Sequence, residues 1–311
     1  MRMRTLGSLS VSTVGLGCNN FGRRLDQDAT KDVVDAALDA GVNLLDTADV
    51  YGDGLSETFL GEVLRGRRDR VVLATKFGMG RRENGTGDGR PETVRAALEE
   101  SLARLRTDHV DLYQLHRPDP NVPVAETLGA LGDAMRAGMV REIGCSNFSA
   151  QQLEEAERAA HGLGGPRFVS VQNEYSMLRR EAEQGVLPAC EHLDVAFLPY
   201  FPLLSGILTG KYRKGRPWPE GTRVRGNERW EAKLTGETLD LVERLSAFAE
   251  SQGYELIDLA FAYLLARPAV ASVIAGAMTP AQVGRNVQAG AWELSQSQVA
   301  EVTAILDEGT P

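Results

Sequence analysis

The sequence predicts a (β/α)8 barrel, which is a closed ring of eight parallel strands surrounded by helices. Apolar runs of strand length alternate with amphipathic segments of helical length, and this alternation favours a parallel sheet with helices outside it. Five of the runs end in polar or ionisable residues: Asp46, Thr75-Lys76, His116, Ser146-Asn147 and Gln172-Asn173. Barrel enzymes carry their active sites at the carboxyl ends of the strands, so these side chains are expected to share one rim. A barrel of typically ~250 residues with additions fits the 311-residue chain, and residues 1–311 are predicted to form a single domain.

Composition and charge argue against several classes of protein. The chain is 42% hydrophobic and 25% charged, which is ordinary for a globular protein, and its net charge of −9 lacks the basic footprint of a nucleic-acid binder. No apolar stretch reaches the ~18 residues of a transmembrane helix, and the first residues contain no long apolar secretion segment. The expected location is therefore the cytoplasm, without a membrane partner. The three cysteines form no CxxC pair, and no metal site is expected.

The elements can be predicted in order. A hairpin turns at Gly7-Ser8, and residues 13–17 form the first barrel strand, whose glycines permit close backbone approach. Gly41 ends the first helix, over residues 28–40, and Ser56 is the expected N-cap of the next, over residues 56–64. Pro91 opens a helix over residues 91–105, and Ser149 caps one over 150–160. The other predicted helices cover residues 124–137, 183–193, 238–252, 255–267, 280–289 and 295–306. The other predicted strands cover residues 42–45, 71–74, 110–115, 143–145, 168–171, 195–198 and 270–275.

One segment, from residue 205 to residue 235, has no clear period and is rich in Gly, Arg, Pro and Trp. Long irregular loops in a compact domain are usually functional. Trp218 and Trp230 lie in this segment. They are equally good candidates for the wall of a substrate pocket and for packing beneath the loop.

Four residues near strand ends make a proton-donating set: Asp46, Tyr51, Lys76 and His116. An unperturbed tyrosine, with a pKa near ~10, is a poor acid, so the ammonium of Lys76 is expected to lower the pKa of Tyr51. Asp46 would hold Lys76 charged and in place, and His116 could donate a hydrogen bond to a substrate oxygen. Singly, each residue has an ordinary structural interpretation. Together they predict protonation of a carbonyl oxygen while a hydride reaches its carbon.

Other motifs are incomplete. Gly15-Leu-Gly17 begins a dinucleotide fingerprint, but Asn20 occupies the place of the third glycine. The segment from Gly206 to Lys211 resembles a phosphate loop, yet it is one residue short and is followed by Tyr212. The chain has four histidines and contains neither HxH, HExxH nor GxSxG, which disfavours a metal-dependent hydrolase and a serine hydrolase.

The ordered motifs resemble those of the aldo-keto reductase family over nearly the whole chain. Asp46-Thr-Ala-Asp-Val-Tyr51-Gly52, with Ser56-Glu57 after it, looks like the tyrosine motif of that family. The later matching motifs are Thr75-Lys76, Leu115-His116, Gly144-Cys-Ser-Asn-Phe148, Gln172-Asn-Glu-Tyr175, residues 200–211 and residues 274–286. The resemblance implies a barrel that binds a nicotinamide cofactor without a Rossmann domain. NADPH is the expected cofactor, and NADH is the alternative.

Carried over by position, the resemblance also implies roles for individual residues. Tyr51 would donate the proton, Lys76 and Asp46 would tune it, and His116 would orient the carbonyl, with Phe21 beside them in the substrate pocket. The implied contacts to the nicotinamide end of the cofactor are Gly17, Cys18, Asn19 and Asp46 on one side, Ser146, Asn147 and Gln172 at the carboxamide, and Tyr200 stacked on the ring. The implied contacts over the pyrophosphate are Phe201, Pro202, Leu203, Ser205, Gly206 and Lys211. Those along the adenosine are Gly276, Met278, Gln282, Arg285 and Asn286. Met278 and Gln282 stand where relatives often carry a basic residue near the 2′-phosphate, and Arg285 is the nearest basic candidate.

The expected activity is the reversible reduction of an aldehyde or ketone to an alcohol by hydride from NADPH. Two alternatives stay open. One is a non-catalytic NADP-binding protein that senses redox state, and the other is an NAD-linked sugar dehydrogenase on the same fold. The expected partner is a small carbonyl or sugar molecule. The physiological substrate and the oligomeric state do not follow from the sequence.

Overall fold

A computed structural model describes residues 1–79, 87–218, 220, 222, 224–225 and 227–308. Its barrel strands are β3 (Val14–Gly17), β4 (Leu44–Asp46), β5 (Val72–Phe77), β6 (Val110–Leu115), β7 (Val140–Ser146), β8 (Ser170–Glu174), β9 (Ala196–Tyr200) and β10 (Val273–Gly276). Within the described residues, these eight strands form one parallel sheet in the order β10-β3-β4-β5-β6-β7-β8-β9. A parallel bridge between Phe197 and Val270 brings the edges β9 and β10 together, so the sheet closes as predicted.

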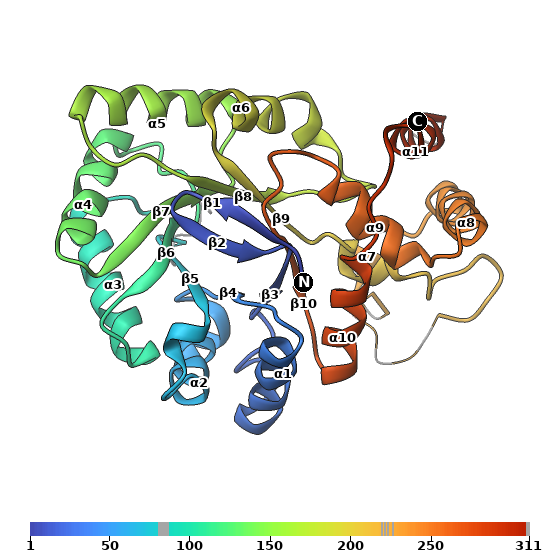
Figure 1. Cartoon of the computed structure of the whole chain (residues 1–311), viewed down its shortest axis with the longest axis horizontal. Coiled ribbons are helices and arrows are strands. Elements are labelled where there is room, and N and C mark those ends of the chain that lie inside the picture. The colour runs from blue at the N-terminus through green and yellow to red at the C-terminus, as the bar shows by residue number, and fades with distance from the viewer. Residues whose placement is uncertain (80–86, 219, 221, 223, 226, 309–311) are drawn as a thin grey trace.

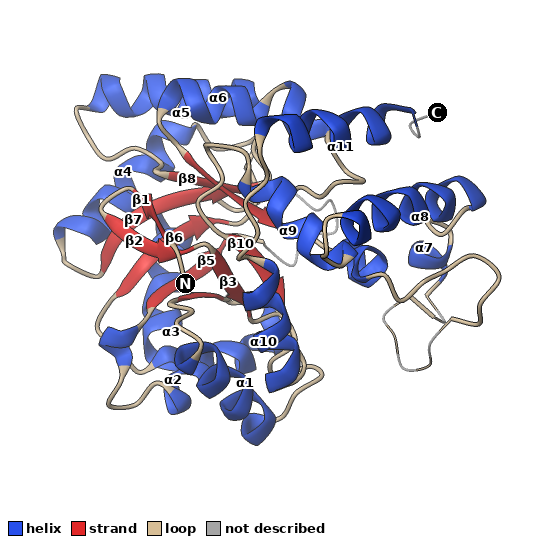
Figure 2. Ribbon diagram, turned by 45° about the vertical axis from the view of Figure 1, so that its right-hand side comes forward, coloured by secondary structure: helices blue, strands red, loops and turns tan. Residues whose placement is uncertain are grey.

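Helices surround this ring, as Figures 1 and 2 show. They are α1 (Gln27–Asp39), α2 (Leu55–Val63), α3 (Pro91–Leu105), α4 (Val124–Arg136), α5 (Ala150–Leu163), α6 (Val186–Leu193), α7 (Glu228–Glu231), α8 (Gly236–Ser251), α9 (Leu256–Leu265), α10 (Pro280–Ala289) and α11 (Gln296–Glu308). Four 3-10 turns complete the elements of the described residues: η1 (Tyr51–Gly54), η2 (Arg68–Arg70), η3 (Glu181–Gln184) and η4 (Leu204–Thr209). In the described part of the chain, no helix is both long enough and apolar enough to cross a membrane.

The N-terminal hairpin closes one end of the barrel. Its strands β1 (Met3–Leu6) and β2 (Leu9–Ser12) pair antiparallel about the predicted turn. The buried side chains of Leu6 and Leu9 share a cluster with Leu44 and Leu112 from inside the ring. These barrel residues lie below the carboxyl ends of their strands, so the hairpin seals the end opposite the predicted site (Figure 1).

Alternation along the strands decides which side chains face the barrel interior. Val72 and Ala74 of β5 belong to the inner cluster, whereas Leu73 belongs to the outer core between strands and helices. Successive strand residues point to opposite faces, so Lys76 continues the inner row at the carboxyl end of β5. The same period places Gln114 of β6 on the inner face, two residues beyond Leu112.

The helix ends correct two predictions. Ser149 caps α5 in a capping box with Gln152, as predicted. Ser56 was expected to cap α2, but Gly54 occupies that position with a φ of 87°. The Ser56 hydroxyl instead donates to the carbonyl of Cys18, at 3.0 Å, because the η1 turn brings α2 against the loop after β3. The helix predicted over residues 183–193 divides at Gly185 into η3 and α6.

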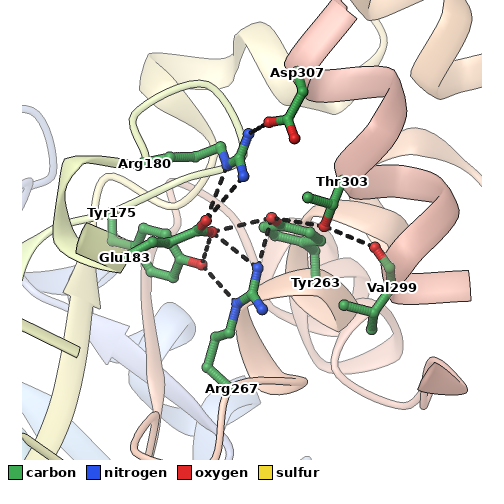
Figure 3. Close-up of polar contacts among 8 residues, drawn as sticks. All are labelled: Tyr175, Arg180, Glu183, Tyr263, Arg267, Val299, Thr303 and Asp307. Atoms are coloured by element: carbon green, nitrogen blue, oxygen red, sulfur yellow. Dashed lines mark hydrogen bonds and ion pairs between the residues drawn. The ribbon is translucent and has the colours of Figure 1, made fainter. Parts of the chain in front are cut away.

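The C-terminal helices lie outside the barrel wall, where α8 packs against α9 and α11 packs against α8 (Figure 2). An ionic network joins this layer to the β8–α6 connection (Figure 3). Glu183 accepts from Tyr175 at 2.7 Å and from Arg180 and Arg267 at 3.0 Å each. Arg180 also donates to Asp307 of α11 at 2.6 Å. The network therefore fixes the last helix to the barrel.

Candidate functional site

A cavity of 1880 Å³ opens at the carboxyl ends of the barrel strands. Its wall contains Tyr51 and His116, and it extends to Glu255, the N-cap residue of α9, and to Arg285 in the middle of α10. Pockets for single small molecules usually measure ~300–1,000 Å³. The volume therefore suits a large ligand together with a second, smaller molecule.

A buried ion pair lies beneath this cavity. The Lys76 side chain is fully buried, and its Nζ donates to Asp46 Oδ2 at 2.7 Å and to the Thr47 carbonyl at 2.8 Å. Burial lowers the pKa of Lys76, but the Asp46 carboxylate and Tyr51 together more than offset this, so the pKa of Lys76 lies above its usual value. Lys76 is therefore a fixed positive charge at the end of β5.

Two glutamine amides hold the other oxygen of Asp46. Gln172 Nε2 donates to Asp46 Oδ1 at 2.9 Å, and Gln114 Nε2 donates to it at 3.3 Å. Gln114 is absent from the predicted site. It lies two residues before His116, and because alternate strand residues face the same side, this spacing could have identified it. Gln172 is expected to contact a carboxamide and lies on the cavity wall, and its amide nitrogen also holds Asp46.

Tyr51 lies directly beside this charge. The Lys76 ammonium is 5.1 Å from the centre of the Tyr51 ring, within range of a cation–π contact. Burial raises the pKa of Tyr51, and Lys76 offsets only part of that rise, so the pKa of Tyr51 lies above its usual value. Lys76 does lower the pKa of Tyr51, as predicted. The prediction is wrong about the net change, because burial raises this pKa by more than Lys76 lowers it. Tyr51 is thus a phenol at neutral pH.

His116 faces Tyr51 edge-on, with ring centres 6.1 Å apart and planes at 81°. Burial, followed by the positive charges of Lys76 and Arg117, lowers the pKa of His116 to about 3. Its Nδ1 is buried and has no hydrogen-bond partner among the described residues. A neutral imidazole with one N–H donor is the form that this environment stabilises.

Polar groups at the neighbouring strand ends form a second network. Tyr200 donates to Asn147 Oδ1 at 2.8 Å, and Asn147 Nδ2 donates to the His116 carbonyl at 2.9 Å. The Ser146 hydroxyl donates to the carbonyl of Gln172 at 2.7 Å. These bonds hold Tyr200 and His116 at fixed positions on the same cavity wall.

The segment after β9 has the features of a phosphate site. Leu204, Ser205 and Gly206 adopt φ values of 45°, 56° and 94°, so three successive residues have left-handed backbone. The φ of Gly206 favours glycine, and the Lys211 ammonium lies close to the backbone here, 2.7 Å from where a Cβ on Gly206 would stand. The hydroxyl of Ser205 is buried without a partner among the described residues. Such a concave backbone with a nearby cation suits an anionic ligand.

The far end of the cavity contains an arginine that is already paired. Arg285 donates to both carboxylate oxygens of Asp258, at 2.6 and 2.9 Å, and to Glu255 at 3.0 Å. Gln282 accepts from the backbone N–H of Met278 at 2.7 Å. Neither Glu255 nor Asp258 was predicted as a site residue, since both precede the motif that contains Arg285.

The structure brings the predicted residues together with few exceptions. Every predicted cofactor contact, from Gly17 to Asn286, lies on the wall of this one cavity. Phe21 does not, because its side chain is fully buried in the core. Trp218 and Trp230 also lie outside the wall and pack edge-on against Tyr212 and Phe201. Wall residues that were not among the predicted site residues include Arg23, Arg24, Met79, Arg117, Glu174 and Glu255.

The chain is similar to known proteins along nearly its whole length. The sequence model of the Aldo/keto reductase family matches residues 13–307. Protein tas of Escherichia coli is 34% identical, over 96% of this chain and 95% of its own. A probable voltage-gated potassium channel subunit beta of Oryza sativa is 36% identical, over 93% of this chain and 91% of its own. The solved glycerol dehydrogenase of Gluconobacter oxydans superposes with a TM-score of 0.86 at 28% identity, covering 99% of this chain and 96% of its own.

Proposed function

Because the chain belongs to the aldo-keto reductase family, we propose that it reduces an aldehyde or ketone to an alcohol, reversibly, with hydride from a nicotinamide cofactor. The observation that carries this proposal is the buried Asp46–Lys76 pair beneath Tyr51, with His116 opposite. This set suits delivery of one proton to a carbonyl oxygen. Such proton transfer by a positioned side chain typically contributes about 10²–10⁴-fold in rate.

Each residue of the set has a distinct part in that proton transfer. A nicotinamide cofactor, when bound, would supply hydride to the carbonyl carbon, or accept it in the reverse direction. The Tyr51 hydroxyl gives its proton to the oxygen, and the Lys76 ammonium stabilises the phenolate that results. Asp46, held by Gln172 and Gln114, keeps Lys76 charged and oriented. The neutral His116 donates a hydrogen bond to the same oxygen as negative charge develops on it.

The rest of the cavity suits a dinucleotide. Its 1880 Å³ accommodates a dinucleotide with a small carbonyl compound beside Tyr51. The left-handed backbone at Ser205 and Gly206, with Lys211 beside it, would hold the pyrophosphate. Asn147 and Tyr200, joined by a hydrogen bond, would hold the nicotinamide between the phosphate segment and Tyr51. NADPH and NADH share all of these groups.

Replacing Tyr51 by Phe tests the proposal. We expect Tyr51→Phe to lower turnover of a nitrobenzaldehyde by about 10²-fold or more, because the proton donor is lost while the ring keeps its packing. Cofactor binding, measured by fluorescence titration, should change little. Tyr254→Phe is the matched control, since Tyr254 is exposed and lies outside the cavity wall. Unchanged turnover in Tyr51→Phe would contradict the assigned proton donor.

A second candidate function is that of a non-catalytic cofactor-binding protein. The similarity to a probable channel subunit supports this candidate. The same assays separate the two functions. A sensor would bind NADPH or NADH but turn over neither aldehydes nor ketones. The panel should include glycerol and sugars in the oxidative direction, because one solved relative is a glycerol dehydrogenase. Cofactor binding without turnover on the whole panel would favour the sensor.

A further inference from the structure

We propose that the far end of the cavity selects NADH over NADPH, with Glu255 and Asp258 excluding a 2′-phosphate and Arg285 unable to bind one. This inference rests on the proposed function, and it reverses the cofactor expected from the family resemblance. Three observations carry it: the pairing of Arg285, the charge of the surrounding wall, and the place of these residues in the cavity.

The pairing of Arg285 is bidentate and partly buried. Both of its terminal nitrogens engage Asp258, at 2.6 and 2.9 Å, and one of them also reaches Glu255 at 3.0 Å. Asp258 is only 8% exposed and also accepts the backbone N–H of Glu255 at 2.8 Å. Bidentate arginine–carboxylate pairs are among the strongest side-chain contacts in proteins. Arg285 therefore cannot turn toward a phosphate without leaving a nearly buried carboxylate without its counter-charge.

The charges at this end of the cavity, where Glu255 and Arg285 line the wall and the buried Asp258 pairs with Arg285, are unfavourable for a phosphate. Two carboxylates face one guanidinium, which leaves the cluster of Glu255, Asp258 and Arg285 with a net charge of −1. A phosphate monoester carries about −1.5 to −2 at neutral pH, so it would be repelled. Met278 and Gln282, which line the wall nearby, add no positive charge. A ribose 2′-hydroxyl, in contrast, can donate a hydrogen bond to a carboxylate such as Glu255, as acidic residues do in NAD sites.

The position of the cluster matches the adenosine end of a bound dinucleotide. The nicotinamide must lie within reach of Tyr51 and His116, where the carbonyl is protonated. The pyrophosphate would lie at Ser205 and Gly206. The remaining nucleoside must then occupy the rest of the same cavity, whose wall there includes Glu255 and Arg285.

Direct binding tests this selectivity without relying on turnover. Titrations of the protein with NADH and with NADPH, followed by cofactor fluorescence, should give a Kd for NADH at least about tenfold lower, since like charges brought together suppress a wrong partner. A Kd for NADPH equal to or below that for NADH would overturn the inference. Binding of neither cofactor would overturn the proposed function as well, so the two failures are distinguishable.

Two variants test the residues. Glu255→Gln removes the exposed carboxylate, and the double variant Glu255→Gln with Asp258→Asn releases Arg285 entirely. The Kd for NADPH should fall in the single variant and fall further in the double variant, by at least about tenfold in total. Glu250→Gln is the matched control, because it removes an exposed carboxylate outside the cavity wall. Thermal unfolding of each variant verifies folding, and the single variant alone keeps the test valid if the double variant does not fold. An unchanged Kd for NADPH in a folded variant would contradict the assignment.

Discussion

Burial acts on Lys76 and His116 in opposite ways, although they lie at neighbouring strand ends. Lys76 has the Asp46 carboxylate 2.7 Å away, so it stays charged despite being fully buried. His116 has no such partner among the described residues, and burial together with two nearby cations lowers its pKa to about 3. A group without a counter-charge gives up its own charge on burial, whereas a paired group retains it. The site thus combines a permanent cation with a neutral donor.

This difference predicts a pH-dependent stability. In the unfolded chain, histidine titrates near ~6.5, whereas folded His116 titrates at about 3. Between these values the unfolded state binds a proton that the folded state does not, so the free energy of unfolding falls as the pH drops from 6.5 toward 3. The variant His116→Gln has no imidazole at this position, so its free energy of unfolding should not show this contribution to the fall. Urea unfolding of both proteins at several pH values should therefore show the wild type losing more stability on acidification. Parallel curves would contradict the assignment.

At the scale of elements, the helix α2 that follows Tyr51 packs unusually close to α3. A Cβ on Gly61 would lie 2.5 Å from the Arg104 carbonyl oxygen and 2.7 Å from the carbonyl carbon of Leu105. Beside this contact, Arg104 Nε pairs with the fully buried Glu57 at 2.7 Å. The backbone contact and the ion pair together determine where α2 begins, and therefore where the Tyr51 turn lies.

Alanine substitutions at two helical glycines test this contact. Gly61→Ala should lower the free energy of unfolding by about 1–3 kcal/mol, because its methyl group meets backbone atoms that cannot move independently. Gly129→Ala in α4 is the matched control, since nothing lies within 4 Å of its Cβ position. It should raise stability by about 0.5–1 kcal/mol through helix propensity. Thermal or urea unfolding measures both, and stabilisation by both substitutions would show that the helices can separate without cost.

At the scale of the whole molecule, Glu183 is the centre of the network that attaches the outer helices. It is bonded to Arg180, which reaches Asp307 in α11, and to Arg267, which follows α9 (Figure 3). Its side chain is 17% exposed and that of Arg267 is 24% exposed, so the pair is shielded from water more than an ordinary surface ion pair. The network lies away from the cavity wall.

Removing this centre should affect stability and leave the cofactor site intact. We expect Glu183→Ala to lower the free energy of unfolding by about 2–3 kcal/mol, because two arginines and two tyrosines lose their acceptor. Glu181→Ala, whose carboxylate is 72% exposed, is the control and should cost less than about 0.5 kcal/mol. Cofactor Kd should be unchanged in both. Equal stability of the two variants would contradict a structural role for the network.

The local pattern was sufficient to predict the helix over residues 91–105 and the strand over 110–115, which have those bounds in the structure. A proline in the first turn and an apolar run between turns favour a helix and a strand through interactions within a few residues, so both elements can be predicted from local sequence. The order of the strand-end motifs likewise predicted that Asp46, Tyr51, Lys76 and His116 would meet at one rim, and they line or underlie one cavity.

The sequence by itself therefore determined the barrel, the order of its elements and the residues at its carboxyl rim. Tertiary structure decided how deeply those residues are buried and which charges surround them. Burial reverses the net direction of the Tyr51 pKa, and packing sends Phe21 into the core. The fold also brings Glu255 and Asp258 to Arg285 from another helix, and both carboxylates form ion pairs with this basic residue of the predicted cofactor site. Desolvation and charge pairing depend on neighbours distant in sequence, and only the folded chain supplies them.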